Sequence, residues 1–226
     1  MGKRYPIPLT RSFGKTKEHI LLESTILFAK KGYAAVSMKD IAKAIGVKPA
    51  SLYNHYAGKE ELWKTVMEHA IGLYLLYFEH LGDELSRAKT FSDLLEIIFS
   101  EPKKMTNIFA CHAFSLIQMD QFRDGLSGTR FHDVFLRYSA EFLAERFDKC
   151  IAGNMVPAFD SKTVATVIMN NVLMAINVKV QACLGRKVPY DPSDMMANLQ
   201  KLLGRLLIPE QPVPASPPRP ASVGAD

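Results

Sequence analysis

Apolar residues recur every three or four positions along most of this chain, and that spacing predicts α-helices. The first four expected helices begin near Thr16, Ser37, Lys48 and Lys59, the fourth running to about Leu81. Further helical segments are expected near residues 90–100, 103–119, 129–152, 161–184 and 193–207. No stretch shows a convincing alternation typical of strands, so the sequence predicts an all-α fold of about nine helices.

Glycine, proline and capping residues mark the ends of these helices. Gly32 follows two lysines and suits a helix C-terminus, while Ser37 with Asp40 three residues later resembles a capping box. Gly46 ends a helix of barely two turns, and Pro49 suits the first turn of the next. Later breaks are expected around Gly82, Pro102, Gly125, Gly128, Gly153, Pro157, Gly185, Pro189 and Pro192.

The short helices over residues 37–55 have the build of a helix-turn-helix. Its second helix must enter a DNA major groove about 12 Å wide, which requires slim residues at the helix start. Residues that fit this requirement are Lys48, Pro49, Ala50 and Asn54. Phosphates beside the groove need hydrogen-bond donors, which are available from Ser51, Tyr53, His55 and Lys59.

The charge distribution agrees with a polyanionic partner. The net charge is +5, but residues 1–64 hold 12 Lys or Arg against 5 Asp or Glu, and the remainder is slightly acidic. Residues 1–15 combine basic residues with Pro6 and Pro8, which predicts a flexible basic arm. A basic tail that only improves solubility is the alternative interpretation.

Four short motifs carry a specific resemblance. They are Phe28-Ala29-x-x-Gly32-Tyr33, Asp40-Ile41-Ala42-x-x-Ile45-Gly46-Val47, Leu52-Tyr53-x-His55-Tyr56 and Lys59-Glu60-x-Leu62. The stretch from Ile20 to Leu62, about a fifth of the chain, resembles without a gap the DNA-binding domain of the TetR family, the tetracycline-repressor-like regulators. Two departures are Gly58, where a helix-capping side chain is usual, and the polar pair Ser24 and Thr25, where apolar residues are usual.

The resemblance implies an all-α homodimer with a three-helix DNA-binding domain and a C-terminal domain that binds a small effector. It implies base-facing positions for Lys48, Pro49, Ala50 and Asn54, and phosphate-facing positions for Ser37, Ser51, Tyr53, His55 and Lys59. Taken singly, Tyr53 could be an ordinary aromatic, His55 a structural histidine and Lys59 a solvated lysine.

The last two expected helices carry wide apolar surfaces, which together with the family resemblance favour a two-fold dimer over a purely monomeric core. The interface residues expected are Val164, Ile168, Ala175, Leu199, Leu203 and Leu206. Aromatic and methionine residues between 90 and 180 suit a hydrophobic ligand, although they also suit an ordinary core. The candidate ligand-binding residues are Phe109, His112, Met119, Phe135, Asn171 and Met174.

Enzyme chemistry is not indicated. The sequence has no phosphate-binding Gly-rich loop and no nucleophile elbow, and its six His residues lack metal-ligand spacing, so no cofactor or metal is expected. Three widely spaced Cys predict free thiols in a reducing compartment, one of which could sense redox state. The absence of an apolar leader or an unbroken apolar span suggests a cytoplasmic protein.

The sequence therefore predicts four parts: a basic arm over 1–15, a helix-turn-helix domain over 16–58, a helical effector-binding and dimerisation domain over 59–208, and a disordered Pro-rich tail over 209–226. The expected function is transcriptional repression, with a homodimer bound to operator DNA, an inverted repeat, and released by a small hydrophobic effector. The alternatives are an effector-independent DNA-binding protein and a helical enzyme or lipid carrier.

Overall fold

The computed structural model describes residues 15–104, 106–120 and 131–208, and the described part of the chain is entirely helical with no strand. Its elements are α1 (Lys15–Lys31), α2 (Met38–Ile45), α3 (Pro49–Tyr53), α4 (Lys59–Leu85), α5 (Phe91–Lys104), α6 (Ile108–Asp120), η1 (Phe131–Tyr138), α8 (Ser139–Ala152), α9 (Ser161–Cys183) and α10 (Ser193–Leu207). Because the π-helical η1 runs directly into α8, the two form one continuous segment. The expected arm, tail and breaks at Gly125 and Gly128 lie outside the described residues, apart from Lys15.

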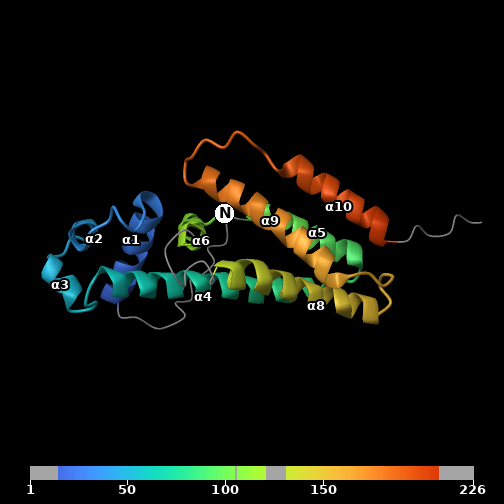
Figure 1. The fold of residues 1–226 in the computed structure, drawn as a ribbon, viewed down its shortest axis with the longest axis horizontal. Coiled ribbons are helices and arrows are strands. Elements are labelled where there is room, and N and C mark those ends of the chain that lie inside the picture. The colour runs from blue at the N-terminus through green and yellow to red at the C-terminus, as the bar shows by residue number, and fades with distance from the viewer. Residues whose placement is uncertain (1–14, 105, 121–130, 209–226) are drawn as a thin grey trace, which may run out of the picture.

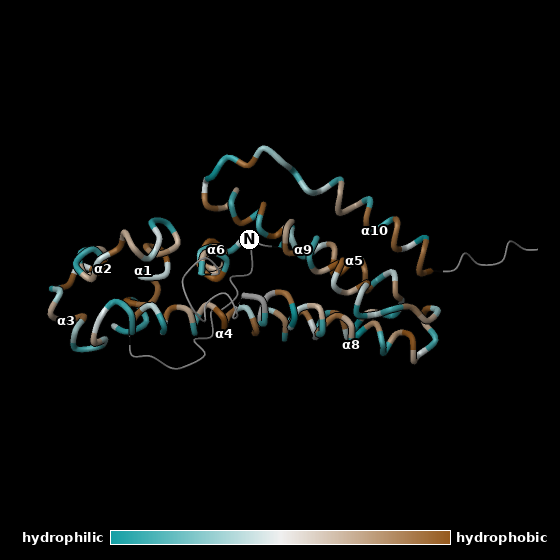
Figure 2. Tube along the Cα trace, in the orientation of Figure 1, coloured by the Kyte–Doolittle hydropathy of each residue, from teal (hydrophilic) through white to brown (hydrophobic). Residues whose placement is uncertain are grey.

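The molecule is long, with α1, α2 and α3 gathered at one end of α4 (Figure 1). The other helices form the body, in which α9 packs against α5, α6 and α8, and α10 lies on α5 and α9. Helix α6 lies between the two parts, because it packs against α1 as well as α4 and α9. Apolar and polar residues alternate along α4, α8 and α10, as expected of helices with one buried face (Figure 2).

Two expected helix breaks are wrong. Helix α4 continues through Gly82 to Leu85, and a Cβ atom built at Gly82 would lie 2.8 Å from Arg146 Nη2. This glycine therefore allows the close approach of the Arg146 side chain from α8 and does not end α4. Pro102 lies inside α5, where it is buried and only two residues follow it, so the missing backbone N–H interrupts just the last turn.

By length and composition alone, α9 is long and apolar enough to cross a membrane. The sequence pattern had indicated the opposite because several polar residues interrupt this segment. In the fold, α9 is packed among α5, α6, α8 and α10, and its buried positions include Ile168, Val172 and Ile176. These contacts are those of a core helix.

Candidate nucleic-acid interface and internal cavity

A capping box fixes the start of α2. The backbone N–H of Ser37 donates to Asp40 Oδ2 at 2.8 Å, and the backbone N–H of Asp40 donates to Ser37 Oγ at 3.2 Å. The Ser37 hydroxyl also donates to the Asp40 carboxylate, and the side-chain and backbone hydrogen bonds from Ser37 lower the pKa of Asp40. The hydroxyl of Ser37 is therefore already engaged within the protein, although it remains exposed.

Gly46 makes the turn between α2 and α3. Its φ of 79° lies in the left-handed region, and its N–H and that of Val47 bond to the carbonyls of Lys43 and Ala42. Lys48 then adopts an extended conformation and Pro49 opens α3, so the turn sets the direction in which α3 leaves α2.

Gly46→Ala should destabilise the protein by about 1–2 kcal/mol, because a side chain in the left-handed region is strained even though the space around it is open. Chemical denaturation followed by circular dichroism measures this change in the free energy of unfolding. Gly58→Ser is the control, since Gly58 has an extended φ of 177° and open space for a side chain. Equal losses in the two variants would show that the backbone conformation of Gly46 is not the cause.

An aromatic cluster ties α1 and the loop after it to α4. The ring of Trp63 contacts those of Phe28 and Tyr33, each with centroids 5.1 Å apart, in edge-to-face arrangements. The Tyr33 hydroxyl donates to Glu60 Oε2 at 2.7 Å. On the inner side of α3, Leu52 is fully buried, so this short helix is held in place by its packing.

The outer side of α3 is the exposed tip of the molecule (Figure 1). The side chains predicted to face bases are all exposed there: Lys48, Pro49, Ala50 and Asn54. Among those predicted to contact phosphate, Tyr53 is 54% exposed and Ser51 and His55 are half-buried. An aromatic ring so exposed contributes little to the core and is available for a partner. These residues thus lie together on α3 and the residues next to it, at one end of the molecule.

Lys59 was expected to face a DNA phosphate, but its side chain makes hydrogen bonds within the protein. Its ammonium donates to the carbonyl oxygens of Tyr33 and Val36, each at 2.9 Å, and lies 4.2 Å from the centre of the Tyr33 ring. The lysine therefore stabilises the loop between α1 and α2 at the start of α4. The motif had shown a cation at the helix start but not the carbonyl groups that surround it.

The two polar residues that depart from the family pattern in α1 are both buried. The hydroxyl of Thr25 donates to the carbonyl of Leu21 at 2.7 Å, one helical turn earlier, so it is satisfied within α1. Neither residue interrupts the helix, which runs from Lys15 to Lys31.

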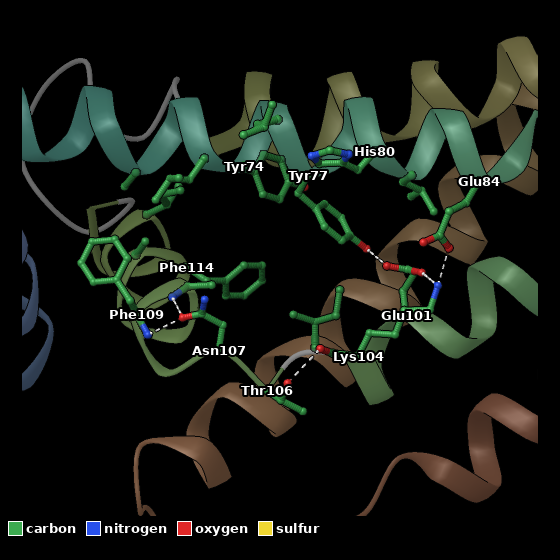
Figure 3. Close-up of a pocket in the computed structure, with 18 residues that line it drawn as sticks. Tyr74, Tyr77, His80, Glu84, Glu101, Lys104, Thr106, Asn107, Phe109 and Phe114 are labelled. Atoms are coloured by element: carbon green, nitrogen blue, oxygen red, sulfur yellow. Dashed lines mark hydrogen bonds and ion pairs between the residues drawn. The ribbon is translucent and has the colours of Figure 1, made fainter. Parts of the chain in front are cut away.

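A cavity of about 180 Å³ lies inside the body, between α4, α5 and α6 (Figure 3). Most of its lining is apolar, including the rings of Tyr74, Phe109 and Phe114. The remaining lining residues are Ala70, Leu73, Leu76, Tyr77, His80, Leu81, Glu84, Glu101, Lys104, Thr106, Asn107, Ala110, Ala113, Ile117 and Ile176.

Charged residues form one end of this cavity (Figure 3). The Tyr77 hydroxyl donates to Glu101 Oε2 at 2.6 Å, and Lys104 Nζ lies 2.6 Å from Glu101 Oε1 and 2.5 Å from Glu84 Oε2. Burial and the charge of Glu101 raise the pKa of Tyr77, so its hydroxyl stays protonated as a donor. Burial alone would lower the pKa of Lys104, but the two glutamates outweigh it and raise that pKa.

Only Phe109 among the predicted ligand-binding residues lines this cavity. His112 is buried elsewhere on α6, where burial and the charges of Lys30 and Arg186 lower its pKa. The other predicted residues are placed as follows: Met119 on the side of α6 near Gly32, Asn171 and Met174 on the outward side of α9, and Phe135 outside the described side chains.

The charged end was missed because its residues lie on α4 and α5, whereas the predicted ligand-binding residues lie on later helices. Tyr77 and Glu84 are seven residues apart on one face of α4, and nothing in that spacing indicates a cavity. The available signal was Glu101, an acidic residue that continues the three- and four-residue spacing of the apolar face of α5.

The predicted dimer face needs correction. Ile168, Ala175 and Leu203 are buried within the single chain, so they belong to its core. Val164 and Leu199 are half-buried against that core, and only Leu206 of the predicted set is largely exposed. The apolar residues that α9 and α10 present outward are Val167, Met174, Leu202 and Leu206.

The described residues offer little for redox or metal chemistry. The three cysteines are free, and burial with the nearby Cys183 thiol raises the pKa of Cys111 to about 12, which disfavours its thiolate. Within the described ranges, no group of three or more His, Cys, Asp or Glu side chains could hold a metal ion.

Comparison with known proteins places the N-terminal helices in a family. The model of the tetR family of bacterial regulatory proteins matches residues 15–66. The biofilm operon icaADBC HTH-type negative transcriptional regulator IcaR of Staphylococcus epidermidis is 28% identical over 94 residues, which cover 41% of this chain and 51% of that protein. The uncharacterized HTH-type transcriptional regulator YerO of Bacillus subtilis is 34% identical over 70 residues, which cover 31% and 24% of the two chains. The aligned part of the chain thus spans about half or less of the length of these relatives.

Solved structures share the fold over most of the chain. A transcriptional regulator from Saccharomonospora viridis in complex with choline aligns with a TM-score of 0.64 and 16% identity, covering 87% of this chain and 99% of that one. The regulator FadR from Bacillus subtilis in complex with stearoyl-CoA aligns with a TM-score of 0.60 and 15% identity, covering 82% and 96%. The matched family consists of regulatory proteins and not of enzymes, and both its motifs and its helical arrangement are present. Residues 15–66 of this chain form a helix-turn-helix domain of the tetR family of bacterial regulatory proteins, and the fold of the whole chain is shared with these solved regulators.

Proposed function

We propose that this protein is a transcriptional repressor that binds operator DNA as a homodimer. The observation that carries the proposal is the outer side of α3, where Lys48, Tyr53 and Asn54 are exposed at the tip of the molecule while Leu52 anchors the helix from within. A short, rigidly held helix with slim, polar outer residues suits entry into the major groove. The name of the relative IcaR, a negative transcriptional regulator, supports repression.

We retain the two domains proposed from the sequence. Residues 16–58 would form the DNA-binding domain and residues 59–208 the effector-binding and dimerisation domain, with the operator an inverted repeat that matches a two-fold dimer. The cytoplasm is the proposed location, because operator DNA lies there in bacteria.

A small molecule in the cavity would act as the effector. The cavity is bounded by α4 and α6, and both helices also contact α1 of the DNA-binding domain. A ligand that binds better to one arrangement of these helices would shift the spacing of the two DNA-binding domains. Two chains of the same fold hold choline and stearoyl-CoA, which supports a small-molecule effector here.

The proposed base contact is tested by Lys48→Ala. This variant should lose about 1–3 kcal/mol of operator affinity and relax the preference at one base pair of each half-site, while binding to scrambled DNA changes little. Fluorescence-anisotropy titrations against operator and scrambled duplexes at several salt concentrations measure both affinities. Operator duplexes come from selection out of a random library.

Lys43→Ala is the matched control, because Lys43 is an exposed lysine on α2, outside α3. This variant should weaken binding to both duplexes slightly and equally, since Lys43 acts only through long-range attraction of phosphates. If Lys48→Ala lowered the affinities for operator and scrambled DNA by the same factor, Lys48 would be a phosphate contact and the proposed base-facing surface would be wrong.

A further inference from the structure

The charged end of the cavity has more negative than positive groups. Glu84 and Glu101 supply two carboxylates, whereas Lys104 supplies one ammonium that already contacts both of them. Tyr77 adds a neutral hydroxyl, which it donates to Glu101. The side chain of Glu101 is only 5% exposed, so water screens its charge weakly. These four groups together carry a net charge of −1 in a largely apolar chamber.

We propose that the effector is a compact organic cation, an amine carried on an aromatic or aliphatic skeleton somewhat larger than benzene. This inference rests on the proposed function and names the ligand class for that site. The ammonium would lie beside Glu84 and Glu101, and the skeleton would pack against Phe109 and Phe114 at the other end (Figure 3). The size follows from the volume of about 180 Å³, since an engineered cavity of about 150 Å³ holds benzene.

The hydrogen bonds at this end leave room for another donor. A carboxylate accepts up to about four hydrogen bonds, and Glu101 accepts one from Tyr77 at Oε2, while its buried Oε1 has an ion pair with Lys104 but no hydrogen bond. The ring faces of Tyr74 and Phe114, which also line the cavity, attract cations. An anionic head group would instead meet two carboxylates, with only the remaining N–H of Lys104 to bind it.

Three probes with the same phenylpropyl skeleton separate the charge of the ligand from its shape: 3-phenylpropylamine, 3-phenylpropanol and 3-phenylpropionate. Each is titrated into the full-length protein by calorimetry and into its operator complex by fluorescence anisotropy. The amine should bind about 10-fold tighter than the alcohol, and the carboxylate should bind most weakly. DNA release should follow the same order.

Glu101→Gln tests the residue that carries the inference. Glutamine keeps the shape and can still accept from Tyr77, so the preference for the amine over the alcohol should disappear while the alcohol binds nearly as before. Glu96→Gln is the matched control, because Glu96 is exposed on the same helix. It should leave the preference intact. If thermal unfolding shows that Glu101→Gln is not folded, Glu84→Gln at the less buried end of the cluster replaces it and should reduce the preference.

The outcomes separate this inference from the function on which it rests. Tighter binding and stronger DNA release by the alcohol or the carboxylate would overturn the cationic ligand but support an effector cavity. An unchanged preference in Glu101→Gln would likewise contradict the role of the carboxylate. If none of the three probes bound, the cavity would not be the effector site, whatever the operator titrations showed about DNA binding.

Discussion

Replacing both Leu202 and Leu206 with aspartate should convert the protein to a monomer and lower its operator affinity by about 100-fold or more. The two leucines are 52% and 69% exposed on α10, next to the outward side of α9. Charges there would be buried without partners in a dimer, but they remain solvated in the monomer. A monomer reads a single half-site, so it loses the gain that comes from binding two linked sites.

Light scattering at micromolar concentration and anisotropy titrations of the operator measure these two effects. Ala197→Asp is the control, because Ala197 is exposed on α10 but points about 140° away from Leu202 around the helix. It should remain dimeric and bind normally. Leu203 is unsuitable for this test, since an aspartate at that buried position would disrupt the chain itself. A wild-type protein that is monomeric while binding its operator tightly would contradict the dimer.

Trp63→Ala should lower the free energy of unfolding by about 3–5 kcal/mol, which approaches the whole stability of many domains. The indole ring is 4% exposed and packs against Phe28 and Tyr33, so its removal leaves a cavity where α1 and the following loop meet α4. Urea denaturation followed by circular dichroism measures the loss. Operator binding should fall with it, because α2 and α3 are attached to the body through this packing.

Tyr53→Ala should weaken DNA binding while leaving stability almost unchanged. The ring of Tyr53 is largely exposed, so its removal should change stability by less than about 0.5 kcal/mol. It should nevertheless weaken binding to operator and scrambled duplexes alike, with little change in salt dependence, because a neutral hydroxyl releases no counterion. A large loss of stability in Tyr53→Ala, or none in Trp63→Ala, would reverse the roles assigned to these two aromatic residues.

The helix-turn-helix was predictable because its determinants are local. Ser37 and Asp40 cap a helix through atoms three residues apart, and Gly46 adopts the left-handed turn that its position required. The predicted helix ends were wrong where contacts between residues far apart in the sequence determine them. Gly82 lies within α4 and leaves space for the side chain of Arg146, more than sixty residues later, and no local pattern contains that information.

The body of the protein was harder to interpret for the same reason. Periodicity shows that α9 has two apolar sides but not which one faces the core, and Ile168 and Ala175 proved to be on the inner side. Similarly, Lys59 looked like a DNA contact from its motif, yet carbonyl groups of the loop after α1 surround its ammonium. The cavity joins residues of α4, α5 and α6 that no sequence spacing relates.

The central claim is that the exposed side of α3 recognises a specific DNA sequence in two copies. Selection of bound duplexes from a random library, followed by sequencing, tests it most directly. The proposed homodimer predicts an enriched inverted repeat whose half-sites are about one helical turn of DNA apart, and a loss of preference at one position of each half-site when Lys48→Ala replaces the wild type. Enrichment of no sequence, or of one that Lys48→Ala selects equally well, would contradict the claim.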